Sequence, residues 1–438
     1  MLISLLRMAT NPTAGLTSLH KKNGSFVKVN LFNKKLIYTS SPDDFSEIFT
    51  QEAKGLLNRD SLYNAKKAMF GDGLFNSNGD IWTNQRRLMQ PFFSKDGVEA
   101  WKSIMLEEAI AANLRICNSL DKCQVNISLE AKETLQRIMV RVLFGQSISG
   151  KADKQLMDSI DTIVKGLFPH LLAETFGKGK LKHFLFFQNR RMQNAINQFA
   201  AFVDNEIERS KTEHSETGLV SMLINATLKS NSYKISNQLL RDEAVTMFLA
   251  GQDTTVNTLA WFFYLIGKHE AIHRKITAEI QSHVGDKVTL DNIENLTYTK
   301  AALYETLRLY PQAIAISRDV AETMELNGKT VDKGTTIILS IYATHRDPSF
   351  WQYPDKFYPE HFLDEHNNSR HKYAYLPYGG GMHTCVGRHF AEIEMMIIIA
   401  TILKSHSVRT KLNVKPTVSI TYKPERDILI SITENTLI

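Results

Sequence analysis

Apolar residues at helical spacing dominate the middle of the chain. Residues 237–267 are apolar nearly all round through the centre of the segment, which predicts a long helix buried inside the protein. The same spacing predicts four more helices, at residues 79–90, 100–117, 298–310 and 386–404. No proline occurs from residue 170 to 310, a stretch of 141 residues. Because proline breaks a helix interior, this stretch favours long helices over a sheet-and-turn domain.

Polar and apolar positions alternate in three shorter segments, which predict strands. Residues 25–38 alternate around Asn33 and Lys34, a pattern typical of a β-hairpin, and residues 418–422 and 428–432 alternate near the C-terminus. Five prolines between residues 311 and 377 predict a meandering, turn-rich segment before the last helix. The pattern therefore indicates a protein that is mainly α with a smaller β part.

Length and composition favour one large domain over several small ones. The 438 residues would allow roughly three domains, but no linker, repeat or low-complexity tract separates them. We therefore expect one domain over residues 1–438. Its parts are a β-rich segment at about 25–40, a helical core at about 79–311, a meander and glycine loop at about 340–387, and a helix with strands at 386–438.

Charge and cysteine content exclude some classes of function. The net charge of +6 is mild and dispersed, which argues against a nucleic-acid-binding protein. Three cysteines (Cys117, Cys123 and Cys385) form no disulfide framework and suit a reducing compartment. The apolar run in residues 1–10 is broken by Arg7, and the run at 395–403 is too short to span a bilayer. We expect a soluble, cytoplasmic protein without a membrane span.

The most informative sequence is YGGGMHTCVG at residues 378–387, where three glycines precede Cys385 at the start of an apolar helix. Glycines permit a tight turn with positive φ that points backbone N–H groups at the sulfur. The positive end of the following helix lies beside the sulfur, so both features should stabilise a thiolate, the form of cysteine that binds metals. Gly387 would let a flat ligand lie close to the helix. Taken alone, the segment also fits a glycine loop with a buried structural cysteine.

A second group of residues, AGQDTT at 250–255, lies in the middle of the predicted central helix. Glycine costs about 1 kcal/mol against alanine in a helix interior, and Asp and Thr side chains compete for backbone hydrogen bonds. We therefore expect the helix to open a groove at this point. The alternative is a helix that crosses another helix at a small residue.

Two pairs of residues at helical spacing complete the set. Glu305 and Arg308 are three residues apart, and Trp82 and Arg86 are four apart, so each pair shares one helix face. Alone, the first pair fits a solvated ion pair worth only tenths of a kcal/mol. The second fits an ordinary amphipathic helix with a half-buried tryptophan.

The four patterns, in this order and at these spacings, resemble the cytochrome P450 monooxygenases of soluble bacterial type over essentially the whole chain. The resemblance implies the cytochrome P450 fold, a single large domain enclosing a haem, with Cys385 as the thiolate ligand of the iron. The family usually has Phe where this chain has Tyr378, and Arg where it has His383. Tyr378 keeps an aromatic shield but adds a hydroxyl that needs a partner. His383 could still bind a haem propionate, with a charge that depends on pH.

The resemblance also assigns roles to the other motifs. Thr254 would hold the oxygen bound to iron and its water, and Asp253 would help relay protons. The residues expected to contact the haem are Trp82, Arg86, Ala250, Gly251, Arg318, Tyr378, Gly379, His383, Cys385 and Gly387, of which Trp82, Arg86 and Arg318 would bind propionates. Glu305, Arg308 and His361 would form a scaffold for the cysteine loop, although the family usually has Arg in the place of His361.

The implied function is a haem-thiolate monooxygenase with haem b as cofactor and O2 as co-substrate. It would insert one oxygen atom into an apolar substrate such as a fatty acid or terpenoid, under a roof at residues 166–187. Because no redox domain is fused, electrons would come from a separate ferredoxin or flavodoxin with its NAD(P)H reductase. The alternatives are a peroxide-using peroxygenase or isomerase, and a non-catalytic haem sensor. Asp253 and Thr254 favour the monooxygenase, and no spare regulatory domain is visible for the sensor.

Overall fold

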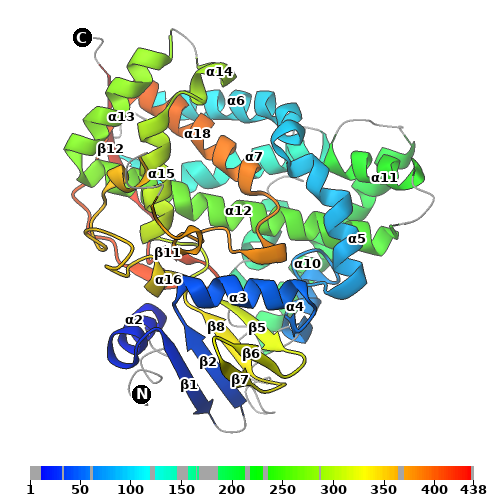
Figure 1. The fold of residues 1–438 in the computed structure, drawn as a ribbon. Coiled ribbons are helices and arrows are strands. Elements are labelled where there is room, and N and C mark those ends of the chain that lie inside the picture. Colours follow the sequence, from blue (N-terminus) through cyan, green and yellow to red (C-terminus); the bar gives the residue numbers. More distant parts are fainter. Residues whose placement is uncertain are drawn as a thin grey trace.

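The computed structural model describes residues 11–31, 34–59, 63–118, 124–145, 156–163, 165–166, 186–212, 218–229, 235–285, 288–363 and 369–435. Helices fill most of the molecule, and a smaller sheet with α2 and α3 lies at its lower end in Figure 1. The helices are α2 Pro12–Asn23, α3 Pro42–Ala53, α4 Tyr63–Phe70, α5 Gly79–Met89, α6 Lys95–Cys117, α7 Ile127–Phe144, α10 Phe186–Thr212, α11 Leu219–Lys229, α12 Asn237–Lys268, α13 Glu270–His283, α14 Leu290–Ile293, α15 Thr297–Leu309, α16 Ile341–Thr344 and α18 Arg388–Ser405. Short 3-10 turns are η2 Gln90–Phe93, η4 Pro359–Phe362, η5 Lys372–Ala374 and η6 Gly381–His383.

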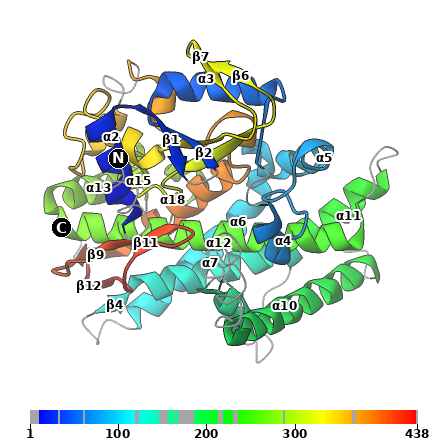
Figure 2. The same ribbon diagram turned by 90° about the horizontal axis from the view of Figure 1, so that it is seen from below.

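The central helix α12 confirms the prediction from its apolar run to within one residue. Ser236 caps its N-terminus, where the side-chain oxygen accepts a hydrogen bond from Leu239 N at 3.1 Å. Most of its residues are buried. Seen from below in Figure 2, α12 crosses the molecule with α7 packed along it, α10 and α11 towards one end and β9, β11 and β12 at the other.

The other four predicted helices are present with shifted ends. Helix α6 begins at Lys95, five residues earlier than expected, because the Ser94 hydroxyl caps it through Gly97 N. Helix α18 begins at Arg388, two residues later than expected, because Val386 and Gly387 still belong to the cysteine loop. Helices α5 and α15 match the predicted segments within one residue at each end.

The main sheet has five strands in the order β1-β2-β8-β5-β3. Strands β1 and β2 form the predicted antiparallel hairpin, in which Leu31 pairs with Lys34, and β2 pairs in parallel with β8. The strands are β1 Phe26–Leu31, β2 Lys34–Thr39, β3 Leu57–Asn58, β5 Ile316–Val320 and β8 Thr336–Leu339, and a separate hairpin joins β6 Met324–Leu326 to β7 Lys329–Val331.

The C-terminal segment corrects one prediction. Residues 418–422 do not form a strand, because Val418 ends β10 (Pro416–Val418), Tyr422 begins β11 (Tyr422–Pro424), and the two residues pair across a turn. The alternation there comes from a turn with an exposed Ile420 at its tip. The second predicted strand is correct, since β12 (Leu429–Glu434) pairs with β9 (His406–Arg409) and β4 (Val125–Asn126).

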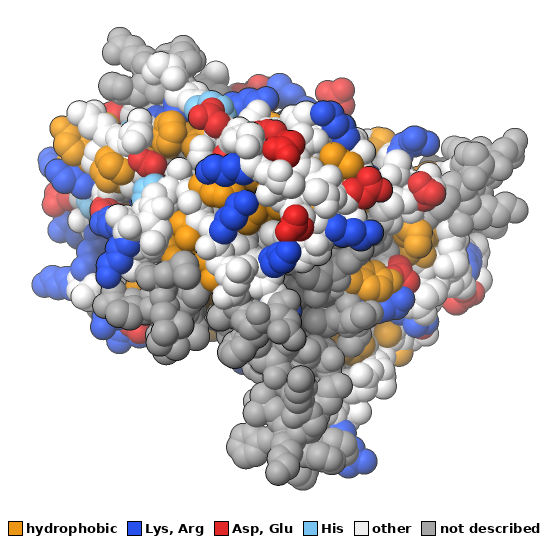
Figure 3. All heavy atoms as spheres, turned by 60° about the horizontal axis from the view of Figure 1, so that its bottom comes forward, with side chains coloured by type: hydrophobic (Ala, Val, Ile, Leu, Met, Phe, Trp, Pro, Cys, Tyr) orange, Lys and Arg blue, Asp and Glu red, His pale blue; other side chains and the backbone are white. Residues whose placement is uncertain are grey.

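The core consists of one large cluster among the helices and two small ones against the sheet. On the face in Figure 3, Lys and Arg side chains are interspersed with Asp and Glu, and hydrophobic side chains reach the surface between them. Within the ranges that the structure describes, no helix is both long and apolar enough to cross a membrane.

Candidate active site

The cysteine loop is a tight turn fixed by its own backbone. Gly379 and Gly381 have φ of 71° and 69°, the left-handed region that favours glycine. Cys385 N donates to Tyr378 O at 2.9 Å, which closes the loop in front of α18. The backbone therefore places Cys385 at the mouth of an apolar helix, as the glycine pattern predicts.

The protonation of Cys385 differs from the expectation of a preformed thiolate. Burial raises the pKa of the Cys385 thiol, while a hydrogen bond from Gly387 N and the nearby Arg86 guanidinium lower it. Desolvation is the largest of these effects, so the sulfur by itself is a thiol. A cation such as iron would have to supply the energy for deprotonation, because metal ligation requires the thiolate.

Tyr378 carries the hydroxyl that the usual Phe lacks. Its Oη is buried and makes no hydrogen bond with any described residue. Burial, and then the carboxylate of Glu392, raises the pKa of Tyr378 well above its ordinary value. The Arg388 guanidinium lies 5.5 Å from the ring centroid. The departure from Phe thus leaves an unpaired hydroxyl beside Cys385.

On the central helix, the structure shows a close helix contact at Gly251 and an open face at Ala250. Helix α12 continues without a break through residues 250–255. A Cβ on Gly251 would lie 3.0 Å from Met139 Sδ, so Gly251 packs closely against the Met139 side chain of α7. Ala250 is exposed although its neighbour Leu249 is buried, and Thr254 donates to Ala250 O at 2.8 Å. Ala250 and Thr254 therefore share one open face of a mostly buried helix.

Asp253 is held by the C-terminal hairpin. Thr421 Oγ1 donates to Asp253 Oδ2 at 2.6 Å and accepts from Asn257 Nδ2 at 3.0 Å. Thr421 lies in the turn between β10 and β11. The sequence pattern placed this residue in a strand, so its contact with Asp253 was not predicted. The predicted catalytic pair Asp253 and Thr254 thus lies together on α12, with the acid oriented from outside the helix.

The predicted propionate-binding residues come together from three parts of the chain. The Trp82 and His383 rings meet edge to face with centroids 4.1 Å apart. Arg86 Nη1, from the same face of α5 as Trp82, donates to Thr384 O at 2.8 Å. Burial, followed by the cations Arg59, Arg318, Arg86 and Lys66, lowers the pKa of His383 to about 2. Among these residues alone, His383 is therefore neutral at ordinary pH.

Glu52 of α3 is a member of this cluster that sequence reasoning missed. Its carboxylate accepts from Arg318 Nε at 2.5 Å and Nη2 at 3.3 Å, and lies 3.5 Å from His383 Nε2. Burial raises the pKa of Glu52, although Arg318 lowers it. Arg318 is thus close to His383, as predicted, but it already has one carboxylate partner.

Glu305 and Arg308 of α15 and His361 of η4 lie together and form the predicted scaffold. Arg308 binds Glu305 through Nε at 2.7 Å and Nη2 at 2.6 Å, and both side chains are fully buried. The remaining Arg308 N–H groups donate to His345 O, Pro354 O and Lys356 O. The pair is buried, and every N–H group of the Arg308 guanidinium donates a hydrogen bond. The alternative interpretation, a solvated ion pair, is therefore wrong.

His345 connects this scaffold to the cysteine loop and was not singled out from the sequence. Leu376 N donates to His345 Nε2 at 2.8 Å, so that nitrogen carries no proton, and Nδ1 donates to Arg308 O at 3.1 Å. Burial lowers the pKa of His345 well below its ordinary value. A neutral histidine therefore holds the residue that precedes the loop.

A glycine-rich turn joins α12 to α5 on the other side of the site. Asp242 accepts from Asp72 N at 2.9 Å, and Glu243 accepts from Leu74 N at 3.2 Å. Gln85, buried on α5 between Trp82 and Arg86, donates to Asp72 O at 2.7 Å. Burial raises the pKa of Glu243 to about 8. The predicted roof at residues 166–187 lies mostly outside the described residues.

Three observations show that these residues fit a haem. The Cys385 side chain is exposed, yet burial has the largest effect on the pKa of its thiol. Both observations fit a side chain that faces a hollow within the protein. Gly387 has an ordinary φ and nothing within 4 Å of an added Cβ, so open space lies over the start of α18. Four cations surround His383, a setting that suits carboxylates.

Comparisons with known proteins agree with this geometry. A family described as Cytochrome P450 matches residues 1–432. The chain is 26% identical to "Cyclooctatin synthase" of Streptomyces melanosporofaciens, over 96% of this chain and 92% of that protein. It is also 26% identical to "Cyclooctat-9-en-7-ol 5-monooxygenase" of the same organism (88% and 83%) and to "Cytochrome P450 4V2" of Rattus norvegicus (80% and 70%).

Among solved structures, the haem domain of cytochrome P450DA superposes with a TM-score of 0.85. That match covers 97% of this chain and 93% of the other at 22% identity, and it supports the fold. The family match extends over nearly the whole chain. This chain therefore belongs to the cytochrome P450 family of haem monooxygenases.

Proposed function

We propose that Cys385 is the iron ligand of a bound haem b and that the open face of α12 at Ala250 and Thr254 forms the oxygen side of the pocket. The observation that carries this proposal is the exposed sulfur of Cys385 at the end of a glycine turn, beside open space over Gly387. Haem bound there would supply the oxidising chemistry: one atom of O2 enters the substrate and the other leaves as water, using two electrons and two protons.

The residues of this chain would bind the cofactor and deliver protons. Arg86 and Trp82 would bind propionates from α5, and Arg318 would do so while it keeps its bond to Glu52. Asp253 and Thr254 would move protons towards the Ala250 face. Thr421 orients Asp253 for this task by donating to one of its oxygens.

The substrate is proposed to be apolar, of fatty acid, terpenoid or similar class. Buried apolar side chains, among them Phe248 and Leu249, lie on α12 directly before Ala250. Two relatives carry names that refer to cyclooctatin and cyclooctat-9-en-7-ol, which supports a cyclic terpenoid as the first compound to test. The electron donor is proposed to be a separate ferredoxin or flavodoxin with its NAD(P)H reductase, and the location cytoplasmic.

One spectrum tests the assignment of Cys385. The reduced protein bound to carbon monoxide should show the absorption band of a cysteinate opposite the CO. Cys385→Ser should lose that band, whereas Cys117→Ser, at a cysteine of α6 beside His406, should keep it. If the serine variant retained both the pigment and its cysteinate band, the assignment would be wrong.

Turnover with different oxidants separates the monooxygenase from its alternatives. We expect product from a reductant and O2, and Thr254→Ala should divert electrons into hydrogen peroxide while haem stays bound. Product only with added peroxide would indicate a peroxygenase, and no product with either oxidant would indicate a haem sensor. A panel of lipophilic compounds, screened for the spin-state change on binding, would identify the substrate class.

A further inference from the structure

His361 stands between two hydrogen-bond acceptors. Its Nδ1 lies 3.2 Å from each carboxylate oxygen of Glu305, and its Nε2 contacts Gln352 O. An imidazole offers at most one N–H on each nitrogen, fewer donors than the planar fork of an arginine provides.

A second basic side chain, Arg370, reaches the same place from the next turn of the meander. Arg370 Nη2 donates to His361 O at 2.7 Å, and Nε donates to Phe350 O at 3.3 Å. Its guanidinium carbon lies 3.8 Å from the ring centroid of Trp351, a fully buried residue. Arg308 lies 4.9 Å from the same ring, so Trp351 contacts both guanidinium groups.

Arg370 also interacts electrostatically with the buried ion pair. Burial lowers the pKa of Arg370 to about 10, Glu305 raises it and Arg308 lowers it. The side chain is therefore still a cation at neutral pH, within range of both members of the pair. Glu305 thus has Arg308, His361 and Arg370 around it, whereas the usual arrangement would provide two arginines. The place of the second arginine is shared between the His361 imidazole and the more distant Arg370 guanidinium.

The position of Arg370 along the chain connects it to the cysteine loop. Six residues later, Leu376 N is held by His345, and between them Tyr375 Oη donates to Tyr304 O at 3.0 Å. Arg370 therefore makes the first attachment of this segment, to the η4 turn at His361, before the loop begins. Loss of the first attachment would loosen the start of the segment that aims Cys385.

We propose that Arg370 is a positioning residue for Cys385, and that together with His361 it does the work of one arginine in the scaffold. The inference rests on the proposed ligation of iron by Cys385. Arg370 supplies the stack on Trp351 and the donors to the meander carbonyls, and His361 supplies the contact with Glu305. Neither residue touches the reacting atoms.

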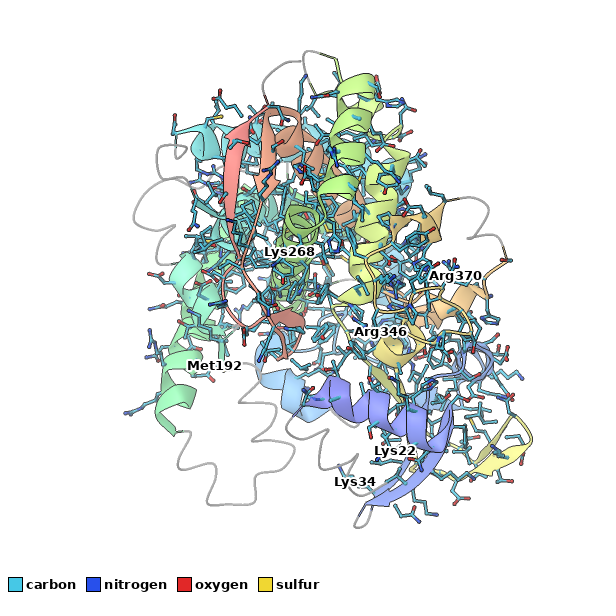
Figure 4. All side chains as sticks on the ribbon, turned by 90° about the vertical axis from the view of Figure 1, so that its left-hand side faces the viewer. Lys22, Lys34, Met192, Lys268, Arg346 and Arg370 are labelled. Atoms are coloured by element: carbon cyan, nitrogen blue, oxygen red, sulfur yellow. The ribbon has the colours of Figure 1, made fainter. Side chains whose placement is uncertain are left out.

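Arg346 offers a matched control. It stacks 4.0 Å from the Tyr342 ring centroid and donates to Leu309 O at 2.5 Å, so it too is a guanidinium held by an aromatic ring and a carbonyl. Both Arg346 and Arg370 act on the pKa of His345, and Figure 4 shows them on the same flank of the molecule. Arg346, however, has its partners at Leu309, Tyr342 and Asp355, and bonds to none of the described residues between 361 and 376.

The test compares the reduced, CO-bound spectra of Arg370→Met, Arg346→Met and wild type. Arg370→Met should raise the fraction of the form without a cysteinate by about tenfold and speed haem loss by a similar factor, whereas Arg346→Met should leave the cysteinate fraction unchanged. Adding His361→Arg to Arg370→Met should restore most of the cysteinate band. If Arg370→Met does not hold haem, Arg370→Lys, which keeps the charge but loses the fork and the flat stack, should give an intermediate fraction.

The results divide clearly. Equal loss of the cysteinate band in the Arg370 and Arg346 variants, or no recovery by His361→Arg, would overturn the role of Arg370. A wild-type protein without the cysteinate band would instead overturn the ligation by Cys385, on which the inference depends. A normal band in Arg370→Lys, equal to that of wild type, would show that charge alone suffices and that the stack on Trp351 has no part.

Discussion

The two sides of the candidate pocket are built in opposite ways. On the cysteine side, the scaffold behind the loop is matched: Arg308 uses all its N–H groups, and His345 has one donor and one acceptor bond. The exceptions lie in the loop itself, where Tyr378 Oη and His383 Nδ1 have no partner among the described residues. On the α12 side, Glu243 Oε1 and Thr246 Oγ1 are buried with no partner among the described residues. Burial also raises the pKa of both Asp242 and Glu243.

This difference indicates a division of labour. A buried network with matched partners has one favourable arrangement, so it can hold a ligand such as Cys385 at a fixed position. Buried acids without a cation partner lower the stability of the region around them, and regions of low stability are where a protein unfolds locally. The turn at residues 71–77 is tied to these acids of α12 through the backbone N–H groups of Asp72 and Leu74, so it is the segment in which to test local opening.

Breaking the buried pair on the cysteine side should have the largest effect. Glu305→Gln leaves the fully buried Arg308 with an uncompensated charge, and removal of one partner from such a pair costs about 3–5 kcal/mol. Urea unfolding of the haem-loaded protein would measure the loss. The exposed pair Lys35–Asp332 is the control, since Lys35→Gln should cost under about 1 kcal/mol. Similar losses in the two variants would contradict the comparison between the two sides.

Crowding the turn on the α12 side should have the next largest effect. Gly71 has φ of +51° and an added Cβ would lie 2.1 Å from Asp242 Oδ2, so Gly71→Ala must break the bond from Asp72 N and should cost about 3 kcal/mol. Gly79 has φ of +58° with nothing within 4 Å, so Gly79→Ala should cost only about 1 kcal/mol. Hydrogen exchange at Asp72 and Leu74 should accelerate in the first variant alone. Equal exchange rates in the two variants would show that the Asp72 and Leu74 amides are not protected by their bonds to α12.

Removing the buried acid should stabilise the protein as pH rises. The pKa of Glu243 is about 8 in the fold against an ordinary 4.5, so the folded chain holds an extra proton between these values. Its contribution to stability is present below pH 4.5 and is lost as pH rises to about 8. Glu243→Gln should match wild type at pH 4.5 and below, and should become progressively more stable than wild type as pH rises to about 8. Parallel stability curves across this range would show that Glu243 is not a buried acid.

The sequence predicts the cysteine side better than the α12 side for a physical reason. Glycines before Cys385 and the spacing of Glu305 and Arg308 are local signals, because the backbone and one helix face create the geometry. Helix α12 was predicted closely because its apolar run is long, but the contact between Gly251 and Met139 depends on another helix, α7, which the local pattern does not report.

The residues that the sequence did not indicate depend on contacts between distant segments. Glu52 meets Arg318 from 266 positions away, and Thr421 meets Asp253 from 168 positions away. Nothing in a local pattern reports such pairs. One signal was available: Asp242 and Glu243 are adjacent acids within an apolar run, where each must find a donor or a proton.

The smallest effect is expected where the two sides meet the C-terminal hairpin, at Thr421. Thr421→Val keeps the shape of the side chain but removes the hydroxyl between Asp253 and Asn257, so the fold should lose only about 1 kcal/mol. If the hydroxyl orients Asp253 for proton transfer, the share of electrons that ends in product should fall while the cysteinate band stays intact. Thr417→Val, in the partner strand β10, is the control for the hairpin itself. A loss of coupling in both variants would assign the effect to the hairpin, whereas a loss confined to Thr421→Val would tie it to the orientation of Asp253.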